Sequence, residues 1–219
     1  MSFGIKLRLW GERACFTRPE MKVERVSYDV PTPSAIRGIL EAIYWKPSIR
    51  WQIDKIHVIK PIKFENIRRN ELGSKLPVSN IKKAMKNTNV KVQNIIEKDR
   101  QQRASLILKN VEYIIEAHFE FISDEDKNEG KHLDMFKRRA SKGQCFHQPC
   151  FGCREFPANF ELFENNIPIS ELQGEKDLGF MLYDMDYSDK KNIQPMFFKP
   201  NMINGIIKVP HINSEEVKR

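Results

Sequence analysis

RVSYDVPTPSAIRGILEAIYWKP, residues 25–47, predicts a turn followed by a helix. Ser34 is a good helix N-cap, and apolar residues recur at helical spacing over residues 35–45. Pro47 stops the helix, because proline disfavours the helical conformation in the residue before it. The helix ends in two aromatic residues followed by a cation, which suits either packing or the edge of an RNA site: Tyr44, Trp45 and Lys46.

Strands are predicted on both sides of this helix. Residues 3–10 alternate apolar and basic side chains, as a half-buried strand does. Residues 53–59 and 111–122 are rich in β-branched and aromatic residues, which favour strands. A short basic helix over 132–142, ended by a glycine, and a strand over 153–162 follow. The order β-α-β-β-α-β predicts an α+β, ferredoxin-like (RRM-type) fold with both helices on one sheet face and the other face free for RNA.

This pattern accounts for residues 1–165, which we expect to form a ferredoxin-like domain with a basic insertion at about 68–109. The remaining residues, 166–219, contain short strand-like segments separated by turns, namely LGFMLYDMDY, MFFKP and GIIKVP. We therefore expect a small β-rich C-terminal lobe.

Length and composition indicate a globular protein with a polyanionic partner. The chain has 219 residues, of which 40% are hydrophobic and 30% charged, and its mean hydropathy is -0.55. A pI near 9.3 and a formal charge of +8 favour nucleic acid as the partner. The sequence contains no apolar run long enough for a membrane span and no signal-peptide pattern at its start, so we expect a cytoplasmic protein without a membrane partner.

The positive charge is concentrated in one segment. Eleven basic and only three acidic residues lie between Arg68 and Lys109, so this segment carries the whole net excess. A solvated, mobile insertion is the common explanation of such a run. The alternative is a set of phosphate contacts, which require lysine and arginine but little sequence precision.

The short segment GQCFHQPCFGCREF, residues 143–156, contains four residues that can bind zinc: Cys145, His147, Cys150 and Cys153. They are crowded into nine residues, whereas zinc ligands usually come from two separated pairs. A glycine-bearing loop that approaches RNA is the better interpretation, with phosphate contacts from Arg138, Arg139, Lys142 and Arg154. Nucleotide-binding glycine motifs, zinc-protease motifs and nucleophile elbows are absent from the sequence.

Four segments together resemble one known family. They are GERACFTRPEMKVERVSYDVPTPSAIRGILEAIYWKP, YIIEAHFEF, RRASKGQCFHQPCFGCREF and LGFMLYDMDY. Their combination and order are similar to the CRISPR-associated RAMP superfamily, and more narrowly to the d variant of its fifth Cas family, from subtype I-C (Dvulg). The similarity extends over nearly the whole chain.

The resemblance implies an endoribonuclease that needs neither metal nor cofactor. Such a protein cuts precursor CRISPR RNA within each repeat, at the base of a hairpin, by attack of a ribose 2′-OH on the adjacent phosphate. It then stays on the mature RNA tag as a subunit of the interference complex. The implied partners are CRISPR repeat RNA and the other subunits, and the basic chain also favours non-specific binding to DNA.

Residue by residue, the resemblance implies that Tyr44 and His118 are catalytic. Lys46 is adjacent to Tyr44 and can supply positive charge. Many relatives carry a lysine two residues before the histidine, where this chain has Glu116, which would stand beside His118 on the strand. Such a carboxylate can raise the histidine pKa or orient its ring, but another cation, Lys46, Lys109 or Arg139, must then stabilise the phosphate.

The expected RNA contacts are Arg25, which stands before the first helix, and selected basic residues of the insertion, of the second helix and of the glycine-bearing loop. The latter are Arg68, Arg69, Lys82, Lys83, Lys109, Arg138, Arg139, Lys142 and Arg154. Two other functions remain open. One is a non-catalytic subunit that only caps the RNA tag, which the acidic residue at position 116 keeps open. The other is a zinc-stabilised RNA-binding module outside CRISPR systems.

Overall fold

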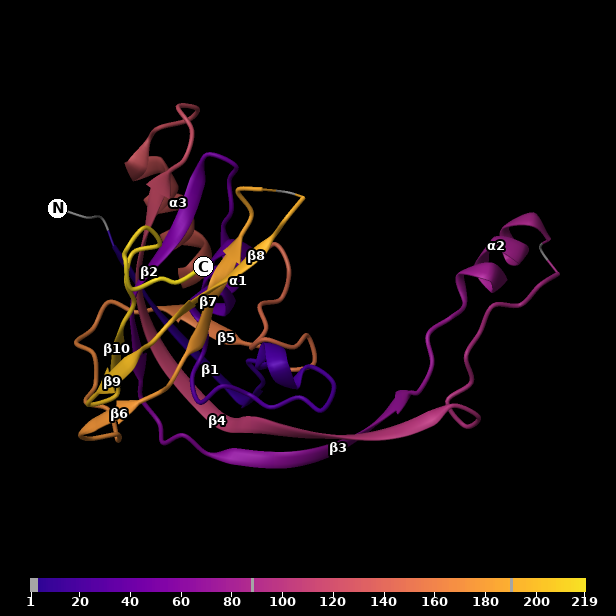
Figure 1. The fold of residues 1–219 in the computed structure, drawn as a ribbon. Helices are drawn as coiled ribbons and strands as arrows, with labels where there is room; N and C mark the ends of the chain where they lie inside the picture. Colours follow the sequence, from indigo (N-terminus) through magenta and orange to yellow (C-terminus); the bar gives the residue numbers. More distant parts are fainter. Residues whose placement is uncertain (1–3, 88, 190) are drawn as a thin grey trace.

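An antiparallel sheet is the centre of the structure, a computed structural model that describes residues 4–87, 89–189 and 191–219 (Figure 1). Its strand order is β5-β1-β4-β2-β10-β9-β6, and β3 pairs with the N-terminal part of β4. Its strands are β1 (Ile5–Ala14), β2 (Ile49–Val58), β3 (Phe64–Leu72), β4 (Arg100–Phe121), β5 (Asn159–Leu162), β6 (Glu175–Asp177), β9 (Asn201–Ile203) and β10 (Ile206–Lys208).

The other elements are three helices, a 3-10 turn and a separate hairpin: α1 (Pro33–Ile43), α2 (Val78–Lys86), α3 (Glu129–Ser141), the turn Pro19–Met21, β7 (Met181–Asp186) and β8 (Gln194–Phe198). The predicted combination of helices with an antiparallel sheet is confirmed. Within the described ranges, no helix has the length and apolar character needed to cross a membrane.

Several predicted boundaries were wrong. The strand predicted over 153–162 is formed only at Asn159–Leu162, because residues 151–156 turn and Pro157 makes only an isolated bridge with Cys150. The strand predicted to begin at residue 111 begins at Arg100 and is 22 residues long. The first predicted strand includes Phe3, which lies outside the described residues.

Helix α1 begins and ends earlier than the sequence pattern predicted. Thr32, not Ser34, is the N-cap, and its hydroxyl accepts a hydrogen bond from the backbone N–H of Ala35 at 3.2 Å. Such a cap stabilises a helix by about 1 kcal/mol. The helix ends at Ile43, and Tyr44 is already extended, with φ -151° and ψ 118°. The residues after Tyr44 are therefore not helical.

The last carbonyls of α1 are each bound by a donor from a distant part of the chain. The backbone N–H of Phe146 donates to Ala42 O at 2.8 Å, Arg139 Nη1 donates to Ile43 O at 2.9 Å, and Trp51 Nε1 donates to Tyr44 O at 3.0 Å. Helix C-termini leave such carbonyls without partners inside the helix. These three bonds join the end of α1 to α3, to β2 and to the loop after α3.

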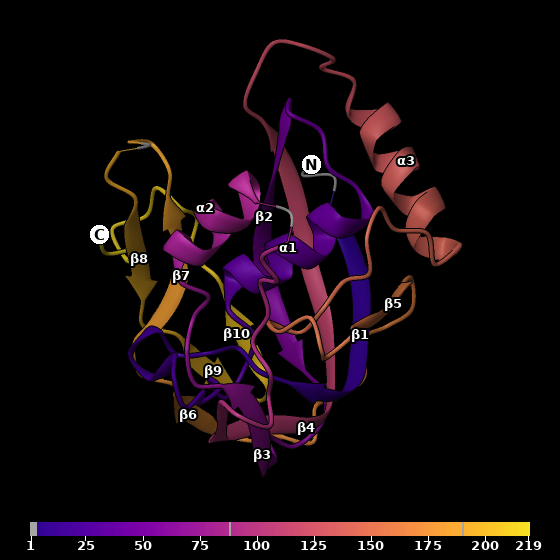
Figure 2. The same ribbon diagram turned by 90° about the vertical axis from the view of Figure 1, so that its right-hand side faces the viewer.

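Helices α1 and α3 cover one face of the sheet (Figure 2). The core on this side includes the ring of Trp51, which lies 5.5 Å from the ring of Phe119 and 4.7 Å from that of Phe136 on α3. Ile36, Leu40 and other apolar residues of α1 are fully buried against the same layer. Each large aromatic side chain buried here stabilises the fold by about 1.5–3 kcal/mol.

The C-terminal segment contributes strands to this sheet and also forms a separate hairpin next to it. Strand β10 pairs with β2, so the sheet continues into residues 201–208. The hairpin β7–β8 lies next to α1, where Arg37 makes two hydrogen bonds of 2.8 Å to the carboxylate of Asp184. The division into domains at residues 165 and 166 stays a prediction.

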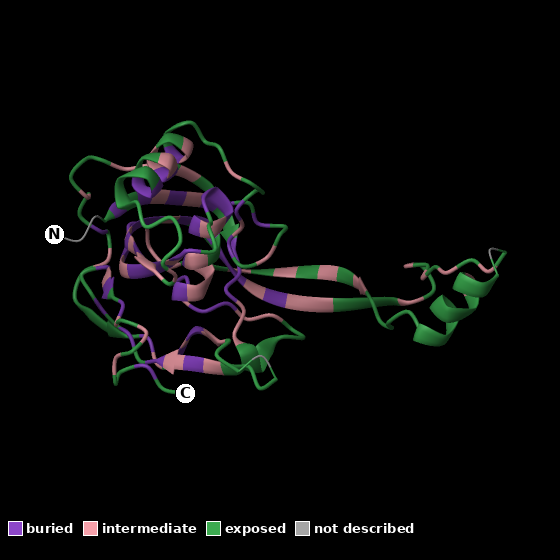
Figure 3. Ribbon diagram, turned by 90° about the horizontal axis from the view of Figure 1, so that it is seen from above, coloured by how far each residue is buried: buried purple, intermediate pink, exposed green. Residues whose placement is uncertain are grey.

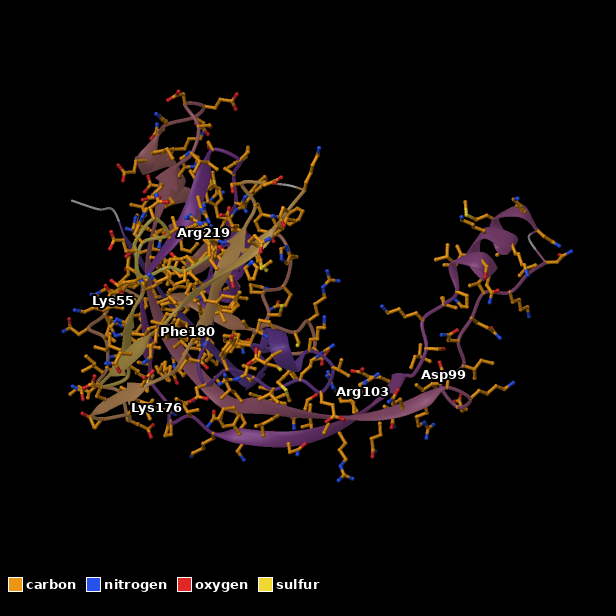
Figure 4. The ribbon with its side chains drawn as sticks, in the orientation of Figure 1. Lys55, Asp99, Arg103, Lys176, Phe180 and Arg219 are labelled. Carbon is orange, nitrogen blue, oxygen red and sulfur yellow. The ribbon has the colours of Figure 1, made fainter. Side chains whose placement is uncertain are left out.

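The basic insertion forms an arm that projects from the body, as Figures 1 and 3 show. Its shaft is β3 paired with the N-terminal part of β4, and α2, which has no buried residue, lies at its tip. Asp99 closes the outer end of the shaft, because its carboxylate accepts from Ser74 Oγ at 2.6 Å and its carbonyl accepts from Gly73 N at 2.8 Å. The side chains of α2 at the tip of the arm point into solvent, whereas Ser105, Ile107 and Leu108 at its base are buried (Figure 4).

A substitution at Gly152 tests how closely the loop after α3 approaches the end of β1. The φ of Gly152 is +81°, and a Cβ there would lie 2.0 Å from Cys15 O. Gly174 has a similar φ of +82° but open space around it. We expect Gly174→Ala to lower the free energy of unfolding by about 1 kcal/mol, from backbone strain alone. We expect Gly152→Ala to lower the free energy of unfolding by about 3 kcal/mol or more, because a steric clash adds to the backbone strain. Urea unfolding checks this, and equal losses would contradict the predicted close approach.

Candidate functional site

His118 is placed by the central strand β4 and oriented by a bulge in the neighbouring strand β2. It lies opposite Gln52, but the pairing register shifts between Ile53 and Lys55, so that Asp54 occupies the bulge. Both carboxylate oxygens of Asp54 lie 2.9 Å from His118 Nδ1. Bulges commonly redirect a side chain, and this one allows Asp54 to reach His118.

The contact with Asp54 fixes which nitrogen of His118 is available for chemistry. A carboxylate only accepts hydrogen bonds, so Nδ1 donates to it, and the neutral ring keeps Nε2 as an acceptor. The hydrogen bond to Asp54 raises the pKa of His118 above its usual value, against the opposing effect of burial. The side chain is 23% exposed. An oriented and accessible imidazole of this kind can take a proton from a substrate or return one.

Glu116 does not act on His118, although the two residues are two positions apart on β4. Its carboxylate binds Lys55 Nζ at 3.0 Å and His57 Nε2 at 2.8 Å. Burial favours the protonated acid, but the hydrogen bonds from Lys55 and His57 outweigh it and keep the pKa of Glu116 below its usual value. The expectation that Glu116 orients the histidine was wrong, because Asp54 does so.

Tyr44 is buried in a pair with His132, which the sequence pattern did not single out. The Tyr44 hydroxyl lies 2.8 Å from His132 Nδ1, and His132 Nε2 lies 2.8 Å from the backbone oxygen of Asp126. A carbonyl only accepts, so Nε2 of the neutral ring carries the hydrogen and Nδ1 accepts from Tyr44. Tyr44 is 2% exposed. Its burial raises the pKa of the phenol, so Tyr44 keeps its proton at neutral pH.

Tyr44 and His118, which were expected to act together, lie on opposite faces of β4. The ring of Phe119 lies 5.8 Å from that of His132, so Phe119 faces α3 and the Tyr44 pair. Successive residues of a strand point to opposite faces. His118 therefore points away from α3, toward the side where Asp54 meets it.

The three cations expected to stabilise the phosphate lie away from His118. Lys109 is nine residues from it along β4, which is about 30 Å in a strand. The guanidinium of Arg139 donates a hydrogen bond to the backbone oxygen of Ile43 at the end of α1. Lys46 is exposed beyond the end of α1, close to the loop that contains Asp126.

Arg50 is a cation near His118 that the sequence pattern missed, whereas Lys55, on the other diagonal, is bound to Glu116. Arg50 lies opposite Glu120, which is two residues from His118 on the same face of β4. Diagonal neighbours of this kind are about 7–8 Å apart. Its guanidinium approaches Asp184 only at 3.8 Å, so it keeps donors for a ligand.

The residues predicted to contact RNA fall into two groups. Arg25 and Arg69 both contact Glu155, and Arg139 is bound to α1, so these three cations already have partners. The other predicted contacts are exposed and lie on the arm, on α3 or in the loop after it: Arg68, Lys82, Lys83, Lys109, Arg138, Lys142 and Arg154.

The sheet face opposite α3 carries ion pairs rather than a uniform positive charge. Arg8 contacts Glu112 and Glu161, each at 2.8 Å, and Lys60 contacts Glu112 at 3.2 Å. The expectation of a free face suited to RNA is therefore only partly met. The excess positive charge lies on the arm instead.

Cys153 turns toward β1 rather than toward the other three residues considered for zinc. Its interaction with Cys15, the largest effect, and the positive charge of Arg25, whose Nη1 lies 3.5 Å from its sulfur, lower the pKa of Cys153. Among the described residues, no group of three or more His, Cys, Asp or Glu side chains is arranged to hold a metal ion.

Comparison with known proteins gives consistent matches over the whole chain. A family model for Cas5d, described as CRISPR-associated protein (Cas_Cas5), matches residues 4–210. A Mannheimia succiniciproducens protein named CRISPR pre-crRNA endoribonuclease Cas5d is 56% identical over the full length of both chains. A Thermus thermophilus protein of the same name is 37% identical over 98% of this chain and 95% of its own. A crystal structure of a CRISPR-associated protein, 25% identical, superposes with a TM-score of 0.71 over 100% of this chain and 97% of the other.

The buried pair of Tyr44 and His132 can be tested by removing one hydroxyl. Tyr44→Phe leaves His132 Nδ1 without a donor inside the protein, and we expect it to lower the free energy of unfolding by about 1–3 kcal/mol. Tyr187→Phe is the matched control, because Tyr187 is 59% exposed. We expect the control to stay within about 0.5 kcal/mol of the parent. Chemical denaturation of both variants checks the pair, and an unchanged stability of Tyr44→Phe would contradict it.

Proposed function

The chain belongs to the Cas5d family of CRISPR-associated proteins, and we propose that it cleaves precursor CRISPR RNA within the repeat, independently of metal ions. It then remains with its product as a subunit of the subtype I-C interference complex. Two curated relatives carry the name CRISPR pre-crRNA endoribonuclease. The observation in this chain that best supports cleavage is the accessible His118, oriented by Asp54.

In the proposed reaction a ribose 2′-oxygen attacks the adjacent phosphorus. The bond from the 2′-oxygen to phosphorus forms, and the bond from phosphorus to the 5′-oxygen breaks. Neutral His118 Nε2 takes the 2′-OH proton as general base, and the leaving 5′-oxygen takes up a proton from solvent water. The products are a 2′,3′-cyclic phosphate and a 5′-OH end. Asp54 stabilises the imidazolium that forms, because its carboxylate accepts from Nδ1.

Tyr44 and Lys46, the other residues predicted to be catalytic, act in this proposal from the opposite side of the sheet. The buried Tyr44 hydroxyl holds the end of α1 against His132, so Tyr44 is a positioning residue. Lys46 is exposed just after it and adds positive potential for the RNA phosphates.

The arm and α3 are the proposed phosphate-binding surfaces. Their exposed lysines and arginines require no base sequence, so they would fix the orientation of the repeat RNA rather than select it. Affinity should fall steeply with salt, because each neutralised phosphate releases counterions. The excess of positive charge between residues 68 and 109 supports this assignment.

We also propose that the core of the sheet is ferredoxin-like. The first four body strands in chain order are β1, β2, β4 and β5, and they lie side by side in the order β5-β1-β4-β2 with antiparallel pairing. With α1 between the first two and α3 between the last two, this is the split β-α-β arrangement.

A non-catalytic subunit that caps the RNA tag is the second candidate function. It is favoured by the acidic surroundings of His118, where Asp54 and Glu120 approach the ring at 2.9 and 3.9 Å. Carboxylates repel phosphate. In this case the protein would bind the repeat hairpin tightly without cutting it.

Cleavage of the host repeat RNA in EDTA tests the proposed function. We expect the parent protein to cut the ribose substrate and not one with a 2′-deoxy nucleotide at the cleavage position. His118→Ala should lower the rate at least about 100-fold, because general base catalysis contributes at least that much, while hairpin binding is retained. His147→Ala, which changes an exposed histidine of the loop after α3, is the matched control and should cut normally.

Dependence of cleavage on a divalent metal ion would contradict this mechanism. Tight binding by the parent protein without cleavage would favour the capping subunit instead.

The pH dependence of cleavage tests the role of Asp54. A general base must be neutral, so the rate should rise as the pH passes upward through the pKa of His118, which Asp54 raises. Asp54→Asn removes the charge that favours the imidazolium, so the His118 pKa falls and the acidic limb of the pH–rate profile should move to lower pH. Single-turnover rates between pH 5 and 9 would show the shift. An unmoved acidic limb would contradict the assigned role of Asp54.

A further inference from the structure

A groove of about 780 Å³ lies where α1 ends, between the start of β2 and the hairpin β7–β8. Its walls include Trp45, Arg50, Glu120, Ile122, Tyr187 and Arg219. Arg219, labelled in Figure 4, lies in the body of the molecule, away from the arm. Ligand sites commonly have volumes of about 300–1,000 Å³, so the groove is large enough for a nucleotide.

The groove exposes large side chains that a folded protein usually buries or shields. Trp45 is 56% exposed, Tyr187 59% and Ile122 62%. Of the two interpretations that the sequence leaves open for this end of the helix, packing therefore does not hold for Trp45. An exposed indole and an exposed tyrosine in the walls of one groove offer flat surfaces on which an unpaired base can stack. Such stacking contributes about 1–3 kcal/mol per base.

The arginines of the groove differ in how many of their hydrogen-bond donors are already used by carboxylates of the protein. Arg37 is committed to Asp184 and Glu41, and Arg219 Nε lies 3.0 Å from Asp186. Arg50 approaches a carboxylate only at 3.8 Å, and among the described residues no side-chain hydrogen bond of 3.5 Å or less uses it. Arginine binds phosphate through two parallel hydrogen bonds. Arg50 therefore keeps its hydrogen-bond donors available for a phosphate group.

The groove is linked to the proposed catalytic histidine through one wall residue. Its wall residue Glu120 lies 3.9 Å from His118 Nε2 and opposite Arg50 across the β2–β4 pair. On the other side the wall is Trp45, which directly follows Tyr44. The groove thus extends from the end of α1 to Glu120, the neighbour of the imidazole that faces away from α3.

We propose that this groove binds one unpaired nucleotide of single-stranded RNA next to the cleaved phosphate, a proposal that rests on the proposed function. Trp45 stacks on the base, and Arg50 binds the phosphate. The ligand class is single-stranded RNA, because the flat aromatic surface, the free guanidinium and the adjoining His118 suit the base, the phosphate and the ribose of a single nucleotide.

Binding of an uncleavable repeat RNA tests the groove apart from catalysis. Two 2′-deoxy-blocked RNAs are compared, a hairpin with its single-stranded flanks and the same hairpin with blunt ends. For Trp45→Ala we expect about tenfold weaker binding of the flanked RNA and unchanged binding of the blunt hairpin. Trp45→Phe should restore most of the affinity, because phenylalanine also stacks. Arg50→Ala should weaken the flanked RNA in the same selective way.

Phe180→Ala is the matched control, because Phe180 is 63% exposed and lies outside both the groove and the loop after α3, and it should bind both RNAs like the parent. Equal affinity of Trp45→Ala and the parent for the flanked RNA would overturn the proposal. It would also be overturned if Trp45→Ala bound both RNAs normally but no longer joined the interference complex, since the groove would then hold a protein. A parent that binds the flank through Trp45 but does not cleave would contradict only the proposed function.

Discussion

The alternation of side chains along β4 is the constraint on which the rest of the structure depends. Phe119 packs toward α3, so its neighbour His118 must point to the other face. The same alternation keeps Tyr44, which belongs to the α3 side, away from the imidazole. Strand β4 thus separates the buried pair of Tyr44 and His132 from the accessible pair of His118 and Asp54. The RNA cleavage proposed here depends on the accessible pair.

The end of α1 connects these two pairs. Three donors from distant segments bind its last carbonyls, and Arg139 is one of them, so this arginine stabilises the fold rather than being free to bind RNA. Because the helix stops at Ile43, the next residues leave the helical path and Trp45 reaches the wall of the groove beside β2. A longer helix, as the sequence pattern predicted, would have placed Trp45 elsewhere.

Much of the body could be predicted from periodicity, since the apolar residues of α1 and the alternation of β1 and β2 are strong local signals. The full length of β4 could not, because residues 100–110 are largely polar and are held as a strand by pairing with β3. The bulge at Asp54 also leaves no local signal, since it exists only in the register between β2 and β4. For the same reason the sequence suggested Glu116, two residues away, as the partner of His118.

Chemical rescue of His118→Ala tests the central claim most directly. Single-turnover cleavage of repeat RNA by this variant would be measured in EDTA with increasing imidazole. We predict very slow cleavage alone and a rate that rises with imidazole, because the free base occupies the space of the missing ring and accepts the 2′-OH proton beside Asp54. Cleavage by the variant at the parent rate without imidazole would contradict the claim that His118 transfers the proton.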